Sequence, residues 1–169
     1  MEIRLSAADL QYLPVNLLHG LSRTRAFLIL GLVVLSPVVY WLASPLFINV
    51  TVHESLPIAV SPASSTITSG TFIDADSFHQ TSGVATILRG EDGSRFVRLS
   101  NFQTTNGPDL FVVLSKDLAA TDVVYVGALK GNIGDQNYAL PSNVDLTHYP
   151  YLLIWCRTFS VLFGSAELS

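Results

Sequence analysis

The sequence predicts an all-β domain, an antiparallel β-sandwich or barrel-like sandwich, preceded by one transmembrane α-helix. Two observations favour this fold class. From Ala26 to Val52 the chain carries no charged residue, and the first part of this run is strongly apolar. Beyond Thr71, short segments rich in branched and aromatic residues alternate with turn-forming clusters, a pattern typical of sandwiches and barrels.

The apolar run from Ala26 to Phe47 is long enough to cross a bilayer. As a helix its residues span about 33 Å, against a hydrocarbon core of about 30 Å. Tyr40 and Trp41 suit the interfacial belt at its far end. We therefore expect a transmembrane helix over residues 26–48. A signal peptide cleaved near Ala43-Ser44 is the alternative, although signal peptides have shorter apolar stretches of about 7–15 residues.

The distribution of basic residues predicts how this helix is oriented. Arg4, Arg23 and Arg25 precede the apolar run, and the next Lys or Arg is Arg89. Because basic residues are retained on the cytoplasmic side, the N-terminus is expected in the cytoplasm. The sequence thus predicts a single-pass plasma (inner) membrane protein, held by a signal-anchor, with a periplasmic or extracellular C-terminal domain.

Composition divides the remaining chain into three parts. Residues 1–25 are expected to form a cytoplasmic leader, and residues 49–70, rich in Ser, Thr, Pro and Val, a flexible tether. Residues 71–169 are expected to form the exported β-sandwich domain. The chain after the apolar run has more acidic than basic residues, which disfavours nucleic acid as a partner.

Six segments of the exported part are expected to be strands. They are short, rich in Val, Ile, Leu and aromatic residues, and separated by clusters of Gly, Asn, Asp and Pro. The expected strands are 84–89, 95–100, 110–114, 123–127, 152–156 and 159–163. No stretch beyond Gly70 keeps a helical period over ten residues, so no further helix is expected.

Cys156 is the only cysteine of the chain, so it cannot form an internal disulfide. In strand phase it shares a face with Leu152 and Ile154, which favours a small buried hydrophobic residue. A redox role instead requires a partly exposed thiolate in an electropositive setting. Arg157 is next in sequence, but in a regular strand it points to the opposite face.

Several phrases of the exported part are more distinctive than generic strands and turns. Together they resemble the DM-thirteen family, the electron transfer domain often found beside DOMON domains. The phrases that carry the resemblance are 101–115, 129–141 and 154–164, with Gly70-Thr-Phe72 and His79-Gln-Thr-Ser-Gly83. The resemblance implies an all-β extracytoplasmic module in which the cysteine of the Trp-Cys phrase is a redox centre or cofactor ligand. Cys156 is that residue here, flanked by Trp155 and Arg157.

Two further side chains are candidates for a site around Cys156. Asp109 closes the turn Asn106-Gly-Pro-Asp109 and serves either that turn or, beside Cys156, as an acid/base or orienting group. His79 or, as the alternative, His148 could join Cys156 in a haem or metal site, although turn or surface roles are favoured for both histidines. Without a Cys-x-x-Cys-His sequence covalent c-type haem is excluded, and no metal site is assigned. The cofactor is left unknown, with haem as one possibility.

From these features we expect a membrane-anchored, extracytoplasmic electron-transfer or redox-responsive module centred on Cys156. Such a module, with an unidentified redox or protein partner, fits the sequence better than a classical enzyme does. The alternative is a non-catalytic ligand- or protein-binding domain at the cell surface, in which Cys156 is packed core.

Overall fold

The computed structural model describes residues 22–44, 47–56 and 65–169. The chain divides into two compact units, Met1–Ala43 and Ser44–Ser169, and each is described by itself. The expected leader, residues 1–25, lies mostly outside the described residues. Its last residues, Arg23 and Arg25, belong to the helix of the first unit.

The helix α1 (Arg23–Ala43) is built from apolar residues without acidic residues in its first turn. Within the described residues, Arg23–Tyr40 is the one segment that is long and apolar enough to cross a membrane, and none of it is buried. Apolar side chains that are exposed along Arg23–Tyr40 are expected for a helix surrounded by lipid or for a signal sequence. Pro37 lies inside the helix.

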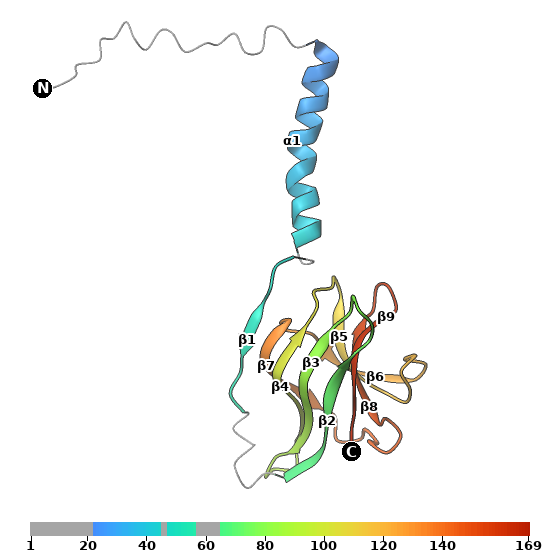
Figure 1. Cartoon of the computed structure of the whole chain (residues 1–169). Coiled ribbons are helices and arrows are strands. Elements are labelled where there is room, and N and C mark those ends of the chain that lie inside the picture. The colour runs from blue at the N-terminus through green and yellow to red at the C-terminus, as the bar shows by residue number, and fades with distance from the viewer. Residues whose placement is uncertain (1–21, 45–46, 57–64) are drawn as a thin grey trace, which may run out of the picture. The chain divides into compact units, whose positions relative to one another are not determined.

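In the part of the second unit that the structure describes, the chain forms nine strands (Figure 1), which confirms the expected all-β fold. The strands are β1 (Thr51–His53), β2 (Ser65–Asp74), β3 (Thr81–Arg89), β4 (Arg95–Thr104), β5 (Leu110–Ser115), β6 (Val123–Ala128), β7 (Ile133–Leu140), β8 (Tyr151–Cys156) and β9 (Val161–Glu167).

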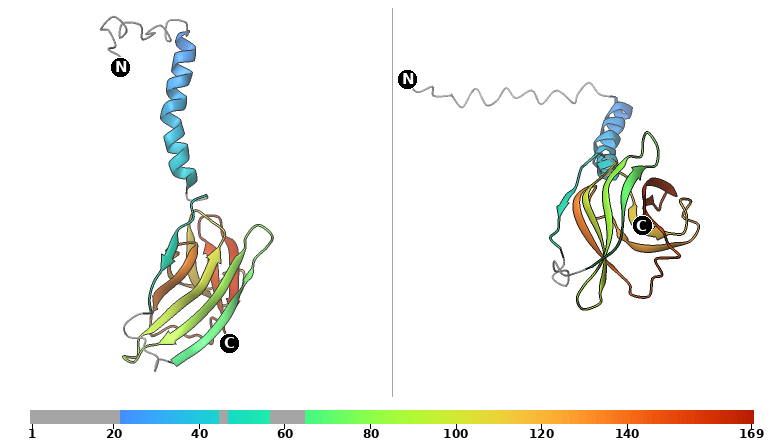
Figure 2. Two further views of the ribbon diagram at one scale, coloured as in Figure 1. Left: turned by 60° about the vertical axis from the view of Figure 1, so that its left-hand side comes forward. Right: turned by 60° about the horizontal axis from the view of Figure 1, so that its bottom comes forward.

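The nine strands form one sheet in the order β1-β7-β4-β3-β2-β9-β8-β5-β6. The pair β1–β7 is parallel and the other pairs are antiparallel. The sheet curls so that β7, β4, β3 and β2 form one wall and β9, β8, β5 and β6 the other (Figures 1 and 2). The architecture is therefore a half-barrel made from one continuous sheet, which is the barrel-like form of the expected fold.

The space between the walls is filled by one apolar cluster to which both walls contribute. Val97 and Leu99 of β4 and Val112 and Leu114 of β5 are completely buried there. Phe102 packs edge to face against Phe72, with 5.5 Å between the ring centroids. Burying these side chains is the main source of stability of a domain without disulfides.

The short strand β1 is held against the sheet by charged side chains. Arg98 donates hydrogen bonds to the Glu54 carbonyl oxygen and to Asp135 Oδ2, both at 2.7 Å. The Lys130 ammonium lies 2.7 Å from Glu54 Oε1, and Glu54 Oε2 accepts a hydrogen bond from the Asn137 amide. We call these residues, Glu54, Arg98, Lys130, Asp135 and Asn137, the β1 clamp.

The structure also refines two expected segments. The range 49–70, expected as a tether, contains β1 and the first part of β2, and residues 57–64 lie outside the described residues. The glycine-rich stretch 131–137, which is not among the expected strands, contributes most of β7, the strand paired with β1. The last strand starts at Val161, since residues 157–160 form the turn between β8 and β9.

Candidate functional site

Four loops meet at one end of the half-barrel, which we call the loop end. They are residues 75–80, 105–109, 129–132 and 157–160. The Thr105 amide donates to the Gln80 carbonyl oxygen at 2.9 Å, and the Arg157 amide to the Asp109 carbonyl oxygen at 3.0 Å. Two pockets and Cys156 belong to this end of the domain, so the candidate functional residues are gathered there.

Cys156 is the last residue of β8 and its side chain points into the core. It is 1% exposed, and its cross-strand neighbours are Leu110 of β5 and Val161 of β9. Leu152 and Ile154, on the same face of β8, belong to the same apolar cluster. The sulfur is therefore packed among apolar side chains at the loop end of the core, one residue before the surface turn.

The turn that follows Cys156 is fastened to the start of β5. Arg157 Nε and Nη2 donate to the two oxygens of Asp109 at 3.0 and 3.3 Å, and Thr158 Oγ1 donates to Asp109 Oδ2 at 2.9 Å. Burial raises the pKa of Asp109, but the hydrogen bonds from Thr158 and Arg157 outweigh this and keep that pKa below its ordinary value. Asp109, Arg157 and Thr158 form what we call the latch.

Trp155 and Arg157 lie on the outer face of β8, opposite to the sulfur. Trp155 is the register partner of Phe111 on the neighbouring strand β5, and the Arg157 guanidinium lies 4.4 Å from the centre of the Phe111 ring. Phe111 in turn contacts the Tyr125 ring edge to face at 5.4 Å. The expected neighbours of Cys156 are thus brought together, but the sheet separates the aromatic and charged ones from the thiol.

His79 lies on the loop that follows β2. Its Nδ1 is 2.8 Å from Asp76 Oδ2. Its ring contacts the Phe163 ring in a tilted arrangement, with 4.4 Å between the centroids and 57° between the planes. Hydrogen bonds from His79, followed by that from the Phe78 amide, lower the pKa of Asp76 to about 2. Phe163 belongs to the same apolar cluster as Cys156, so the histidine reaches the core through a ring contact.

The arrangement does not fit a haem or metal held by Cys156. The sulfur is buried among apolar side chains, and it lines neither pocket of the loop end. In the part of the chain that the structure describes, no three His, Cys, Asp or Glu side chains are grouped so that they could hold a metal ion. A ligand bond from the thiolate would require the core to open first.

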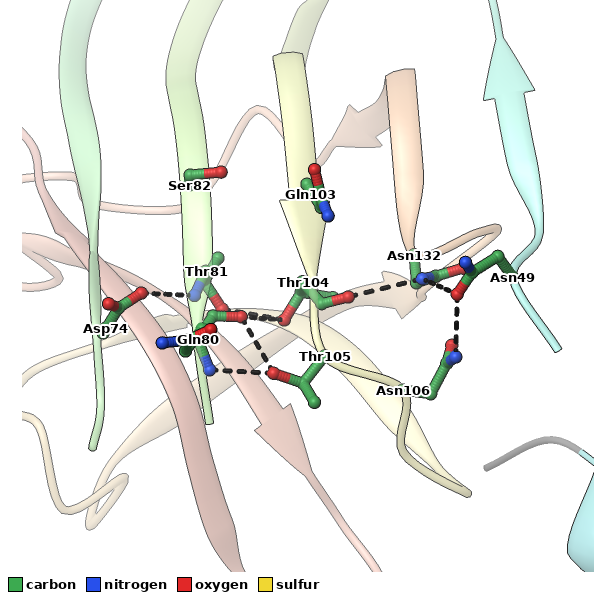
Figure 3. Close-up of a pocket in the computed structure, with 10 residues that line it drawn as sticks. All are labelled: Asn49, Asp74, Gln80, Thr81, Ser82, Gln103, Thr104, Thr105, Asn106 and Asn132. Carbon is green, nitrogen blue, oxygen red and sulfur yellow. Dashed lines mark hydrogen bonds between the residues drawn. The ribbon is translucent and has the colours of Figure 1, made fainter. Parts of the chain in front are cut away.

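A polar pocket of about 510 Å³ lies at the loop end (Figure 3). Amides and hydroxyls line it, with one carboxylate. The lining residues are Asn49, Asp74, Gln80, Thr81, Ser82, Gln103, Thr104, Thr105, Asn106 and Asn132. They come from the ends of β2, β3 and β4, from the loops next to β3 and β4, and from the segments just before β1 and β7.

Hydrogen bonds tie the buried part of this polar pocket together. Asp74 Oδ1 accepts from the Thr81 amide at 2.7 Å, and the Thr81 and Thr104 hydroxyls lie 2.7 Å apart. The Asn132 side-chain amide donates to Asn49 Oδ1 at 2.9 Å and to the Thr104 carbonyl oxygen at 3.3 Å. Figure 3 shows this row of contacts crossing the sheet.

Sequence reasoning missed the polar pocket because its members look like ordinary strand-end and turn residues. The signal was present in two polar triplets, Gln80-Thr81-Ser82 and Gln103-Thr104-Thr105. Gly131 and Asn132 lie in the glycine-rich stretch 131–137, next to Lys130 and close to Gln136 in sequence. Lys130 does line the second pocket, whereas Gln136 is completely buried in β7.

A second pocket, of about 350 Å³, adjoins the polar pocket and shares Asn106 and Asn132 with it. Its lining is more apolar and includes Val50, Leu110 and Leu129. Leu110 is the β5 neighbour of Cys156, and it is 8% exposed. The Leu110 side chain is therefore a point at which the second pocket and the surroundings of the sulfur meet.

Comparison with protein families gives one match. The family model described as Electron transfer DM13 matches residues 71–168, from the middle of β2 to the residue after β9. No curated protein and no solved structure matches the chain. The match covers more than half of the chain and includes Cys156, the latch and most of the polar pocket. The chain therefore belongs to the Electron transfer DM13 family.

Proposed function

We propose that this protein is a membrane-anchored extracytoplasmic electron-transfer or redox-responsive module in which Cys156 is the redox group. In this proposal α1 anchors the chain, the N-terminus stays in the cytoplasm, and the β domain works outside. The family match is the observation that carries the redox assignment. Because Cys156 is the only sulfur-bearing side chain of the matched region, it is the side chain best suited to that chemistry.

The placement of Cys156 restricts the reaction it can carry. A lone cysteine exchanges electrons by thiol–disulfide chemistry only with a sulfur of another molecule. The Cys156 thiolate would form a bond to one sulfur of a partner disulfide, and the second sulfur would leave as a thiolate. With the sulfur 1% exposed, this step requires a local opening of the β8–β9 turn.

The latch is the contact that opposes this opening. Arg157 and Asp109 are close to the surface, with side-chain exposures of 57% and 25%, so their ion pair is weak compared with a buried one. The Arg157–Phe111 contact adds a cation–π attraction of similar size. The domain thus holds the thiol behind a small, breakable set of surface contacts, as suits a group that reacts only when a partner binds.

Thiol labelling of the full-length protein in detergent or nanodiscs tests this proposal. We expect slow reaction of native Cys156 with a maleimide, and reaction about three- to tenfold faster in Arg157→Ala, because the ion pair and the cation–π contact are lost. Arg89→Ala, on an exposed arginine of β3 with no side-chain partner among the described residues, is the control and should label like the parent. Mass spectrometry measures the labelled fraction over time.

Two outcomes would contradict the redox role of Cys156. One is a thiol that reacts only after global unfolding, at a rate that Arg157→Ala leaves unchanged. The other is a Cys156→Ser variant that keeps the full redox activity of the parent in the membrane. The visible absorption spectrum of the purified protein adds an independent reading, since a Soret band would assign the redox role to haem instead.

The polar pocket favours a second candidate function. A non-catalytic domain that binds a ligand at the cell surface needs a preformed cavity with polar groups aimed into it, and the loop end has one. In that case Cys156 contributes only to packing. The two functions are separable, because the first depends on the thiol and the second on the pocket side chains.

A further inference from the structure

We propose that the polar pocket of the loop end binds a neutral carbohydrate. The assignment goes beyond the redox function and does not depend on it. It rests on three properties of the pocket, which are the chemistry of its lining, the rigidity of its buried part and the unused hydrogen-bonding groups at its rim.

The lining matches the chemistry of a sugar. Sugar hydroxyls both donate and accept hydrogen bonds, and side-chain amides and hydroxyls, which make up the lining except Asp74, do the same. No lysine or arginine lines the pocket, so a phosphate or carboxylate ligand would find no cation and would be repelled by Asp74. The volume of about 510 Å³ lies within the range of small-molecule sites.

The buried part of the pocket is held in place before any ligand arrives. Thr81, Thr104 and Asn132 are 2%, 3% and 8% exposed, and each makes hydrogen bonds within the domain. Asn49 Oδ1 accepts from the side chains of both Asn132 and Asn106, each at 2.9 Å, which fixes the far side. A prearranged site loses little conformational entropy on binding, so weak polar contacts can still give measurable affinity.

The rim offers groups that the described protein does not use. The side-chain amides of Gln80 and Gln103 and the Ser82 hydroxyl make no hydrogen bond with other described residues. Figure 3 shows Ser82 and Gln103 on neighbouring strands, where they are paired. Asp74 keeps one carboxylate oxygen free while the other accepts from Thr81. These groups together can bind several hydroxyls of one ligand.

An exposed aromatic residue is in backbone contact with one of the lining residues. Phe78 is 81% exposed, and its carbonyl oxygen accepts a hydrogen bond from Thr105, one of the lining residues. A phenylalanine this exposed is unfavourable in water, and its ring can cover the apolar C–H face of a sugar. The neighbourhood therefore provides both polar and apolar contacts that a sugar ring can use.

Calorimetric titration of the full-length protein in detergent tests the assignment. The probes are maltotriose, cellotriose and triacetylchitotriose, with inorganic phosphate and triglycine as comparisons. We expect at least one of the sugars to bind with a Kd of about 1 mM or tighter, and neither comparison probe to bind. Gln103→Ala should weaken sugar binding about three- to tenfold, because one hydrogen-bonding side chain is removed. Asp74→Asn should weaken sugar binding by at least as much, because the charged carboxylate that makes stronger hydrogen bonds is replaced by a neutral amide. The carbonyl oxygen of the new side chain can still accept the hydrogen bond from the Thr81 amide.

Asn143→Ala provides the matched control. Asn143 is an exposed amide in the loop after β7, at the opposite end of that strand, and this variant should bind sugar like the parent. Circular dichroism melting checks that all three variants are folded. The assignment is overturned if none of the sugars binds at concentrations on the order of 10 mM, if Gln103→Ala and Asp74→Asn bind as well as Asn143→Ala, or if phosphate or triglycine binds instead.

Discussion

The surroundings of Cys156 and the polar pocket lie at the same end of the domain, yet water is excluded from the first and can enter the second. The sulfur is enclosed by apolar side chains of β5, β8 and β9 and closed from outside by the latch. The polar pocket is open, and its rim carries side-chain amides and a carboxylate oxygen that have no hydrogen-bond partner among the described residues. The buried thiol is thus kept apart from the polar side chains that line the pocket.

The same division appears along single strands, where neighbouring residues face opposite sides of the sheet. In β4, Phe102 is 1% exposed and packs in the core, while Gln103 is exposed and lines the polar pocket. In β8 and the turn that follows it, Cys156 is buried and Arg157 is exposed. A pair of substitutions one residue apart can therefore separate stability from function.

The largest effect is expected from the pair in β4. Phe102→Ala should lower the free energy of unfolding by about 3–5 kcal/mol, because it leaves a cavity opposite Phe72. Gln103→Ala should change it by less than about 0.5 kcal/mol, as an exposed substitution. Chemical denaturation of both variants measures the difference. Equal stability of the two would mean that the core and the pocket are not divided as described.

A smaller loss is expected when the sulfur itself is replaced. Cys156→Ser should destabilise the domain by about 1–3 kcal/mol, because the new hydroxyl loses its hydrogen bonds to water when it is buried among the apolar side chains of the core. Cys156→Ala, which removes the sulfur without adding a polar atom, separates the loss of packing from the cost of polarity. Thermal melting compares the three proteins, and a serine variant as stable as the parent would place the side chain in a polar environment instead.

The smallest effect concerns the β1 clamp and its dependence on pH. Burial raises the pKa of Glu54, but the Lys130 and Asn137 contacts outweigh it and lower that pKa below its ordinary value of 4.5. A carboxylate with a lowered folded pKa stabilises the fold above its unfolded pKa, and this contribution is lost as the pH falls through the folded pKa.

At neutral pH, Glu54→Gln should therefore cost less than about 1 kcal/mol, since the pair is partly exposed. The difference from the parent should shrink below about pH 4. Denaturation at several pH values measures it, with Glu167→Gln, on an exposed glutamate without a side-chain hydrogen bond among the described residues, as the control. A difference that stays constant down to low pH would show that the Glu54 charge does not hold β1.

Much of the fold follows from sequence patterns. Five of the six expected strands lie within or nearly coincide with β3, β4, β5, β6 and β8, because apolar and branched residues dominate them. The alternation in β8 placed Cys156 with Leu152 and Ile154, and the structure buries all three.

Strand β7 was not predicted from the sequence, and the reason is physical. Its sequence is polar, yet Gln136 is completely buried and satisfied by bonds with the Gly131 carbonyl oxygen and the Tyr138 hydroxyl. On the outer face, Asp135 and Asn137 belong to the β1 clamp. A strand stabilised by side-chain hydrogen bonds from distant segments has no local apolar signal that a single sequence can reveal.

The same limit applies to the site. The phrases around Cys156, Asp109 and His79 singled these residues out, but which of them touch depends on the register of strands far apart in sequence. Asp109 meets Arg157 only because Leu110 is paired with Cys156. The polar pocket likewise joins Asn49 to Asn132, which are far apart in the chain.

The parallel pairing of β1 with β7 has a consequence for where this domain can be cut. The family match begins at residue 71, inside β2, whereas the sheet also uses β1 and the first half of β2. A fragment starting at the family boundary would leave the backbone N–H and C=O groups of β7 unpaired at an open edge. Such edges recruit strands from other chains, so that fragment would tend to aggregate. The smallest soluble piece of this protein is therefore larger than its recognisable family segment.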